Sequence, residues 1–209
     1  MNKKIVFLFL SFAFLVLFFA FSVIVKKQYL VQFDFDTTVR LQNHVPLRLD
    51  RFFPLFSFLA SIQSMAIILA LILIFLRKWR GILIFLIFFV SHLVELFGKV
   101  FINHPPPPFM FFRHNPYGFS FANDYVRQGN SFPSGHSMRT VFVAIIFTYL
   151  IYHINKLPRE LKLVLLGGSL LFVILVGISR ISLGEHWATD VIGGGFFGAG
   201  MAFFSLLFI

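Results

Sequence analysis

The sequence contains no cysteine and carries little charge. The absence of cysteine from its 209 residues excludes disulfides, cysteine-ligated metal sites and thiol catalysis. Charged residues account for only 12% of the chain, whereas a soluble domain carries roughly 25%. The chain therefore lacks the polar surface that a water-soluble globular protein needs. A disordered chain is excluded as well, because 19% of the residues are aromatic and disordered segments are poor in aromatics.

Apolar residues take the place of the missing charge. They make up 58% of the chain, phenylalanine alone contributes 33 residues, and the mean hydropathy is +0.88. These values are typical of an integral membrane protein. The net charge of +10 is divided among short basic clusters between apolar runs, an arrangement typical of membrane-flanking anchors. We therefore expect the membrane as a partner, and no nucleic acid.

Six apolar segments predict membrane-spanning helices, each of which needs roughly 20 residues. The first segment has a longer apolar core than the roughly 7–15 residues of a signal peptide, so we expect an uncleaved helix. Residues 26–51 mix charged and apolar side chains and predict an interfacial connection that is partly helical. A long polar loop is expected over 103–135 and a tight loop over 179–185. The predicted spans are 5–25, 55–76, 81–102, 136–154, 163–178 and 186–209.

The fold class that follows is an all-α, six-span transmembrane helical bundle, formed by a single domain over residues 1–209. Cytoplasmic loops carry an excess of lysine and arginine, and a modest bias of this kind predicts that both termini are cytoplasmic. The last span also carries a face of small residues, which favours close helix packing. Its members are Gly193, Gly194, Gly195, Gly198 and Gly200. The basic residues expected on the cytoplasmic side are Lys3, Lys4, Arg77, Lys78, Arg80, Lys156, Arg159 and Lys162.

Charged side chains gather at one set of span ends. A charge at the centre of a span costs about 2.5–3.5 kcal/mol, so such residues are rare. The loops after the third and fifth spans face the same side of the membrane, whichever way the chain is inserted. Taken singly, each residue has an ordinary explanation, such as an anchoring lysine or an acid favoured by a helix dipole. Together they predict one pocket at the membrane interface, formed by Lys99, His136, Arg180, His186 and Asp190.

Residues 133–136, with the sequence Pro-Ser-Gly-His, stand directly before the fourth predicted helix. Ser134 is a residue type that caps helices, and Gly135 allows the backbone to approach a ligand closely. The free N–H groups of a helix N-terminus form a natural phosphate site. The string is short and made of ordinary cap residues, so it favours phosphate binding only in combination with other motifs.

A second motif is formed by Arg180, His186 and Asp190. On a helix, His186 and Asp190 would share a face at i and i+4. Asp190 would then accept a hydrogen bond from one imidazole nitrogen and leave the other free, which makes the histidine a competent nucleophile or base. The planar guanidinium of Arg180 suits phosphate oxygens. This spacing is more specific than the Pro-Ser-Gly-His string.

Lys99, the 133–136 segment and the Arg180–Asp190 segment together resemble the three signature motifs of the type 2 phosphatidic acid phosphatase family. The family shares its core with the vanadium haloperoxidases, and its membrane members hydrolyse lipid phosphates or diphosphates without a metal or cofactor. The resemblance implies that His186 attacks phosphorus to form a phosphohistidine, that Asp190 orients His186, and that His136 protonates the leaving oxygen. It further implies that Lys99, Ser134, Gly135 and Arg180 hold the phosphate oxygens.

The first motif departs from the family pattern, because Pro106 stands where the family has an arginine. Removing a donor aimed at developing charge can cost about 2.7–4 kcal/mol, so either the activity is reduced or another cation substitutes. Arg139, three residues after His136, is our first candidate. Arg113 and His104 are loop alternatives, although we expect both to be solvated. Glu185 repels phosphate and is expected to tune His186 or to pair with a loop arginine.

The leading hypothesis is an integral-membrane lipid phosphatase with a metal-independent phosphohistidine mechanism and a role in lipid metabolism. The alternatives are a phosphotransferase that uses the same intermediate and a non-catalytic lipid-phosphate binder or transporter. A vanadate-dependent peroxidase is disfavoured, because such enzymes are mainly soluble. We expect a multi-pass protein of the cell membrane whose active site faces the extracytoplasmic side. Both phosphatidate-like and polyprenyl diphosphate substrates fit the motifs, which do not specify an oligomeric state.

Overall fold

A computed structural model describes residues 2–75, 81–113 and 129–209, and the whole of this part is helical or irregular. The predicted end of the second span at Leu76, the basic cluster at 77–80 and residues 114–128 of the long loop lie outside it. The all-α prediction is confirmed. The elements are α1 (Lys3–Lys26), α2 (Val31–His44), η1 (Leu47–Arg51), α3 (Phe53–Leu59), α4 (Ile62–Phe75), α5 (Gly81–Phe101), η2 (Phe109–Phe111), α6 (Gly135–Tyr152), α7 (Arg159–Ser182), α8 (Ala188–Ser205) and η3 (Leu206–Phe208).

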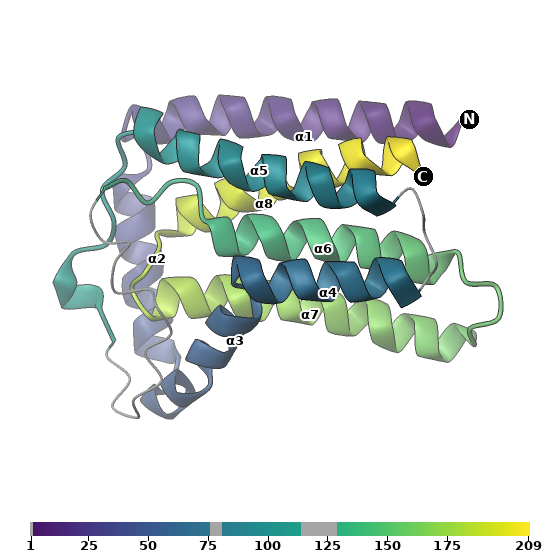
Figure 1. Ribbon diagram of the computed structural model, residues 1–209. Coiled ribbons are helices and arrows are strands. Elements are labelled where there is room, and N and C mark those ends of the chain that lie inside the picture. Colours follow the sequence, from purple (N-terminus) through teal and green to yellow (C-terminus); the bar gives the residue numbers. More distant parts are fainter. Residues whose placement is uncertain (1, 76–80, 114–128) are drawn as a thin grey trace.

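The long helices run side by side, and α2 lies across one end of the bundle (Figure 1). In the described part of the chain, five helices are long and apolar enough to cross a membrane, or six if the bent pair formed by η1–α3 and α4 counts as one span. The predicted interfacial segment over 26–51 is indeed partly helical. Its helix α2 buries Asp34 and Thr38 against the bundle and packs on α7 and α8.

The second span is not the continuous helix that the sequence predicted. The chain bends by 60° between Leu59 and Ile62. Ser61 stands directly before α4, and its Oγ accepts the backbone N–H of Ser64 at 3.2 Å, which is the bond of a helix N-cap. The carbonyl of Ala60 accepts Nε–H of Arg139 at 3.3 Å. A break at membrane depth is tolerated here because other groups satisfy the freed backbone.

Two boundaries near the predicted pocket also differ from the prediction. Helix α7 continues to Ser182, so the tight loop begins at Leu183 and not at Ser179. Helix α8 begins at Ala188, with Trp187 as its N-cap residue, so His186 lies in the loop and not on the helix. Gly184 shapes this loop with a φ of +70°, and a Cβ there would lie 2.2 Å from the carbonyl oxygen of Phe111. Only glycine fits such a position without strain.

Helix α8 lies at the centre of the bundle and packs closely on α6 and α1. The small-residue face predicted from its glycines permits this close packing. Ideal Cβ atoms at Gly194 and Gly198 would lie 2.3 Å from the carbonyl oxygens of Ser134 and Met138 on α6. The two backbones therefore meet directly, as in other small-xxx-small helix pairs. This packing holds the N-terminus of α6, which carries the Pro-Ser-Gly-His motif, beside the start of α8.

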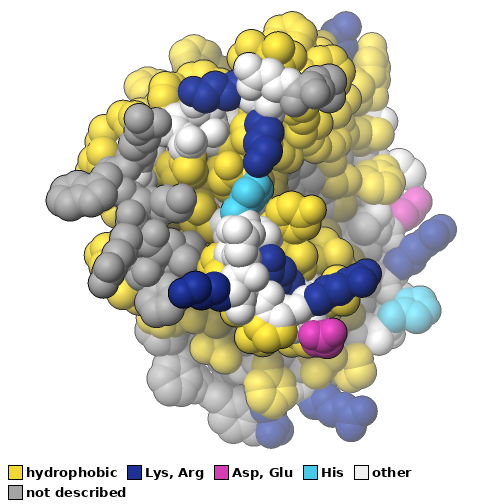
Figure 2. All heavy atoms as spheres, turned by 90° about the vertical axis from the view of Figure 1, so that its right-hand side faces the viewer, with side chains coloured by type: hydrophobic (Ala, Val, Ile, Leu, Met, Phe, Trp, Pro, Cys, Tyr) yellow, Lys and Arg dark blue, Asp and Glu magenta, His cyan; other side chains and the backbone are white. Residues whose placement is uncertain are grey.

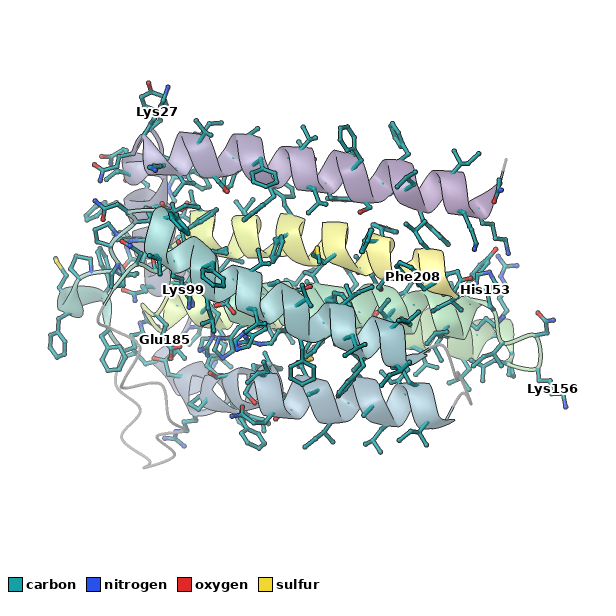
Figure 3. All side chains as sticks on the ribbon, turned by 45° about the horizontal axis from the view of Figure 1, so that its top comes forward. Lys27, Lys99, His153, Lys156, Glu185 and Phe208 are labelled. Atoms are coloured by element: carbon teal, nitrogen blue, oxygen red, sulfur yellow. The ribbon has the colours of Figure 1, made fainter. Side chains whose placement is uncertain are left out.

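The two ends of the bundle differ in chemistry. Lys99 and Glu185 lie at one end, while His153, Lys156 and Phe208 lie at the other (Figure 3). Figure 2 looks onto the latter end and shows several lysine or arginine side chains spread over it. There Lys3 Nζ lies 3.2 Å from Nε2 of His153, and Lys162 Nζ donates to the carbonyl of Tyr152 at 2.9 Å. The prediction that the loops after the third and fifth spans lie on the same side is therefore confirmed, because α5 ends and α6 begins at the same end of the bundle as the α7–α8 loop.

The close approach of α8 to α6 predicts a difference between two neighbouring glycines. Gly198→Ala should destabilise the protein by about 1–3 kcal/mol, because the new methyl group overlaps the Met138 carbonyl. Gly195→Ala is the matched control, since its Cβ would lie 3.9 Å from Val141 and alanine favours a helix. Thermal unfolding in detergent should show a lower midpoint for the first variant only. Equal midpoints for both variants would contradict the packing argument.

Candidate active site

The residues of the predicted pocket come from four helix ends. Lys99 lies at the end of α5, His136 in the first turn of α6, Arg180 in the last turn of α7, and Asp190 in the first turn of α8. Arg180, Arg139, His186 and Lys99 are all close enough to His136 to act on its charge. Three stretches that are far apart in the sequence thus form one charged cluster at the end of the bundle opposite His153 and Lys156 (Figure 3).

His186 is held by Asp190 although it is not on the helix. Its Nδ1–H donates to Oδ2 of Asp190 at 3.2 Å, which leaves Nε2 for another partner. The backbone N–H of His186 donates to the carbonyl of Arg180 at 3.2 Å, and that of Glu185 donates to the same carbonyl at 3.0 Å. The predicted contact between His186 and Asp190 is therefore present. The prediction that both residues lie on one helix was wrong, because His186 belongs to the tight loop before α8.

The carboxylate of Asp190 is fully buried and accepts three hydrogen bonds. Oδ2 accepts Nδ1–H of His186 and the backbone N–H of Trp187 at 2.9 Å. The second of these bonds caps the N-terminus of α8, where a negative charge is also favoured by the helix dipole. Oδ1 accepts Nδ1–H of His104 at 2.9 Å. Asp190 thus combines the structural role and the orienting role that the sequence offered as alternatives.

His104 is the largest departure from the sequence analysis. It was expected to be a solvated loop residue or a substitute phosphate ligand, but its side chain is buried between two carboxylates. Nε2 lies 3.6 Å from Oδ2 of Asp34, on α2, and Nδ1 binds Asp190. Burial alone would lower the pKa of His104, but the hydrogen bonds and charges of Asp190 and Asp34 outweigh it and raise this pKa to about 9. The ring is therefore an imidazolium at neutral pH.

Lys99 and Arg139 share one carboxylate, that of Glu95. Oε1 of Glu95 lies 3.0 Å from Nζ of Lys99, and Oε2 lies 3.3 Å from Nη1 of Arg139. Oε2 also accepts Nδ1–H of His92 at 2.8 Å. The carboxylate rests against Gly135, where a Cβ would lie 2.5 Å from Oε1. The absence of a side chain at Gly135 therefore makes room for Glu95, a reason that the sequence did not indicate.

Arg180 is fully buried and only partly satisfied. Its Nη1 donates to Oε2 of Glu185, and Nε donates to Oγ of Ser179 at 3.4 Å. Nη2 is buried and has no hydrogen-bond partner among the residues that the structure describes. A buried donor without a partner costs about 1–3 kcal/mol, so such an atom requires an explanation. Glu185 thus pairs with an arginine of helix α7. The sequence analysis had offered a loop arginine as its partner, and that expectation was wrong.

Ser134 occupies the N-cap position of α6, but its side chain does not make the predicted capping bond. The start of the helix is instead held by its backbone, because Ser134 N–H donates to the Asp190 carbonyl at 3.0 Å. The Ser134 hydroxyl accepts from Oγ of Ser137 at 3.4 Å. Next to it, Nε2 of His136 lies 3.5 Å from Oγ of Ser57 on α3. The Ser134 hydroxyl therefore lies at a helix N-terminus beside the Asp190 backbone.

Arg113 does not join the cluster. Its guanidinium donates to the carbonyls of Gln42 and Val45 and lies 3.5 Å from Asp50. All these partners belong to the end of α2 and to the segment that follows it. Arg113 is thus part of the packing of the interfacial segment, whereas Arg139 lies beside Lys99 through Glu95. Of the candidates for a substitute cation, the structure brings only Arg139 to the phosphate ligands predicted from the motifs.

Glu95, His92 and Asp34 are cluster residues that the motifs did not single out. Two signals were present, because His92, Glu95 and Lys99 fall on one face of a helix at i, i+3 and i+7, and charged groups inside a span are rarely without function. Asp34 carried no comparable signal, since it stands among other charges on an amphipathic segment. A separate apolar groove of about 560 Å³ lies between α1, α6, α7 and α8 and contains none of these residues.

Comparisons with known proteins agree with this arrangement. A model of the PAP2 superfamily matches residues 79–209. Phosphatidylglycerophosphatase B of Bacillus subtilis (strain 168) is 37% identical over 135 residues, which cover 64% of this chain and 59% of that protein. The chain therefore matches less than two thirds of the length of this relative.

Two solved structures share the fold. The crystal structure of a transmembrane PAP2 type phosphatidylglycerolphosphate phosphatase from Bacillus subtilis superposes with a TM-score of 0.77 at 23% identity, covering 95% of this chain and 94% of the other. The structure of Aquifex aeolicus LpxE gives a TM-score of 0.59 at 24% identity, covering 83% and 94%. At these identities the likeness concerns the fold.

Proposed function

Because the chain belongs to the PAP2 superfamily, we propose that it is an integral-membrane phosphatase that hydrolyses a phosphate or diphosphate ester of a membrane lipid without a metal. The substrate class is supported by the relative, which is named for phosphatidylglycerophosphate. It is also supported by the position of the cluster at the end of an apolar bundle, where a lipid head group can reach the charges while its tail remains in the membrane.

The observation that carries the proposal is the pairing of a buried, unsatisfied donor with an oriented histidine. In the described part of the chain Nη2 of Arg180 has no partner, and the backbone N–H of His186 donates to the carbonyl of the same arginine. A phosphate oxygen would satisfy the guanidinium and bring phosphorus to His186, whose Nδ1 is already engaged by Asp190. A protein that only bound phosphate would have no need of a nucleophile with its own orienting carboxylate.

The reaction follows from these positions. Nε2 of His186 forms a bond to phosphorus as the ester P–O bond breaks, and His136 gives its proton to the departing oxygen. Water then attacks phosphorus while His136 takes up a proton from it, the P–N bond to His186 breaks, and inorganic phosphate leaves. Lys99, Arg180 and the N-terminus of α6 at Ser134 and Gly135 hold the phosphate oxygens. Phosphoryl transfer depends mainly on such positioning and charge stabilisation, which is the part that these residues would supply.

Arg139 takes the place of the arginine that Pro106 replaces in the first motif. It is the one candidate cation that shares a carboxylate with Lys99, and it acts on the charge of His136. Each phosphate ligand with a positive charge is paired with an acid, since Glu95 neutralises Lys99 and Arg139 and Glu185 neutralises Arg180. The incoming phosphate therefore competes with two carboxylates that hold the cations in position.

The protein is a cell-membrane protein in this proposal, with its active site on the extracytoplasmic side. Lys3, Lys4, Lys156, Arg159 and Lys162 belong to the end of the bundle opposite the site, where α1 begins and where α6 and α7 are joined. Cytoplasmic segments are enriched in such residues, so this modest bias supports a site on the other side, although the first loop there also carries Lys26, Lys27, Arg40, Arg48 and Arg51.

The absence of cysteine makes this orientation directly testable. Met110→Cys, at an exposed position near the site, should react with a membrane-impermeant maleimide in intact cells. Lys156→Cys, at the opposite end, should react only after the cells are permeabilised. The reverse pattern would show that the site faces the cytoplasm.

The mechanism predicts unequal effects for the two histidines. His186→Ala should abolish phosphate release, because the nucleophile is lost, whereas His136→Ala should mainly slow esters with poor leaving groups. The measurement is inorganic phosphate released from phosphatidylglycerophosphate, phosphatidate and a polyprenyl diphosphate in detergent with excess chelator.

Full activity of His186→Ala would exclude the phosphohistidine. Binding of these lipids by the unaltered protein without any release would favour a non-catalytic binder. Transfer of phosphate to an added alcohol in preference to water would favour a phosphotransferase.

The proposed substitution by Arg139 predicts a loss of at least tenfold in kcat or kcat/KM for Arg139→Ala, which corresponds to about 1.4 kcal/mol. Arg139→Lys keeps the charge and should recover part of this loss. Arg113→Ala is the control, because Arg113 pairs with Asp50 outside the site. Unfolding midpoints identify variants that fail to fold, and an unchanged rate in a folded Arg139→Ala protein would assign the role to another residue.

A further inference from the structure

A continuous row of acids and histidines leads from His186 through Asp190 to His104 and then to Asp34 on α2. We propose that His104 is a positioning residue of the enzyme, a buried cation that holds Asp190 and through it sets the orientation of His186. This inference rests on the proposed phosphatase activity and assigns a role to a residue between Lys99 and Pro106 to which the first signature motif gives none.

Burial makes a cation necessary at this point. Asp34 and Asp190 are 2% and 0% exposed, and within the described chain neither forms an ion pair with a lysine or an arginine. Two unpaired carboxylates in such a place would cost several kcal/mol each. Only the imidazolium form of His104 can donate from both ring nitrogens, so only this form can serve both acids.

The backbone around His104 is equally constrained. Its N–H donates to Oδ1 of Asn130 at 2.9 Å, and its carbonyl accepts the backbone N–H of Ser131 at 2.8 Å. Nδ2 of Asn130 donates to the carbonyl of Lys99 at 2.8 Å. The Pro-rich segment after α5 is thereby fixed to the segment that leads into α6. A residue held at so many points supports the geometry of its neighbours.

Asp34 connects the row to the start of α8. Its Oδ1 accepts the backbone N–H of Thr189 at 2.8 Å, and its Oδ2 accepts the hydroxyl of the same residue at 2.7 Å. Thr189 is adjacent to Asp190, so Asp34 and His104 hold that carboxylate from two directions. The interfacial helix α2, which lies outside the part of the chain matched by the family model, is in this way part of the site.

The charge of His104 neutralises the carboxylate that orients His186. Its Nδ1 lies 2.9 Å from Oδ1 of Asp190, while the other oxygen of this carboxylate accepts the hydrogen bond of His186. The charged or titratable groups facing His104 in the described chain are Asp34 from α2 and Asp190 from α8, with His186 behind Asp190. Ser131 Oγ, 3.4 Å from Nδ1, is neutral.

Kinetics of charge-changing variants test the proposal. His104→Gln retains a donor but loses the charge, so kcat should fall at least tenfold with KM changed by less than threefold. His104→Arg restores the charge and should recover part of the lost kcat. His44→Ala, at an exposed histidine of α2, is the control and should leave kcat and KM unchanged.

A second readout does not depend on activity. The pKa of about 9 lies above the ordinary value of 6.5, so the stability that His104 contributes is fully present below pH 6.5 and lost as the pH rises through 9. The unfolding midpoint of His104→Gln should therefore lie below that of the unaltered protein at pH 6, and the gap should close by pH 10.

The two readouts together separate the possible failures. An unchanged kcat in a folded His104→Gln protein, or a gap in midpoints that is independent of pH, would overturn the proposal. A second outcome is that the unaltered protein releases no phosphate from any lipid, while the gap in midpoints between it and His104→Gln closes with pH as expected. That result would support the charged contact of His104 with the two acids and would contradict the phosphatase activity.

Discussion

Charge neutralisation at the membrane boundary is the constraint on which the rest of this structure depends. Every buried acid of the site has a cation beside it, with Glu95 between Lys99 and Arg139, and Asp190 between His104 and His186. An isolated charge would be too costly in such surroundings, so the pairs also fix where each functional group lies. Within the described residues one nitrogen of the buried Arg180 remains without a hydrogen-bond partner, and the proposed function assigns a phosphate oxygen to it.

Close packing of two backbones brings these pairs together. Gly194 and Gly198 allow α8 to contact the backbone of α6, and the bond from Ser134 N–H to the Asp190 carbonyl joins the two helix starts. Because the contact is between backbones, side chains at both helix termini reach the same small volume. The 60° bend before α4 serves the same site, since the carbonyl freed there binds Arg139.

The sequence predicted the main features correctly where the signal was local. Apolar runs predicted the bounds of α1, α5 and α6 closely. The alternation of spans and loops correctly placed the loops of the charged motifs at one end of the bundle. The sequence-based prediction failed where a residue's environment depends on distant segments. His104 was expected in solvent as a residue of the long polar loop, yet it is buried between Asp34 and Asp190. The second span was expected to be straight, since a single serine cap inside an apolar run gives little indication of a bend.

Composition and hydropathy by themselves determined that this chain spans a membrane as helices, and its motif spacings determined the family and the residues to which roles are assigned. These properties are local, because they follow from side-chain transfer energies and from short intervals along one helix. Tertiary structure alone decided which acid neutralises which cation. Those pairings join α2, α5, α6 and α8 and arise only when burial forces each charge to find a partner, a condition that no single segment of the sequence contains.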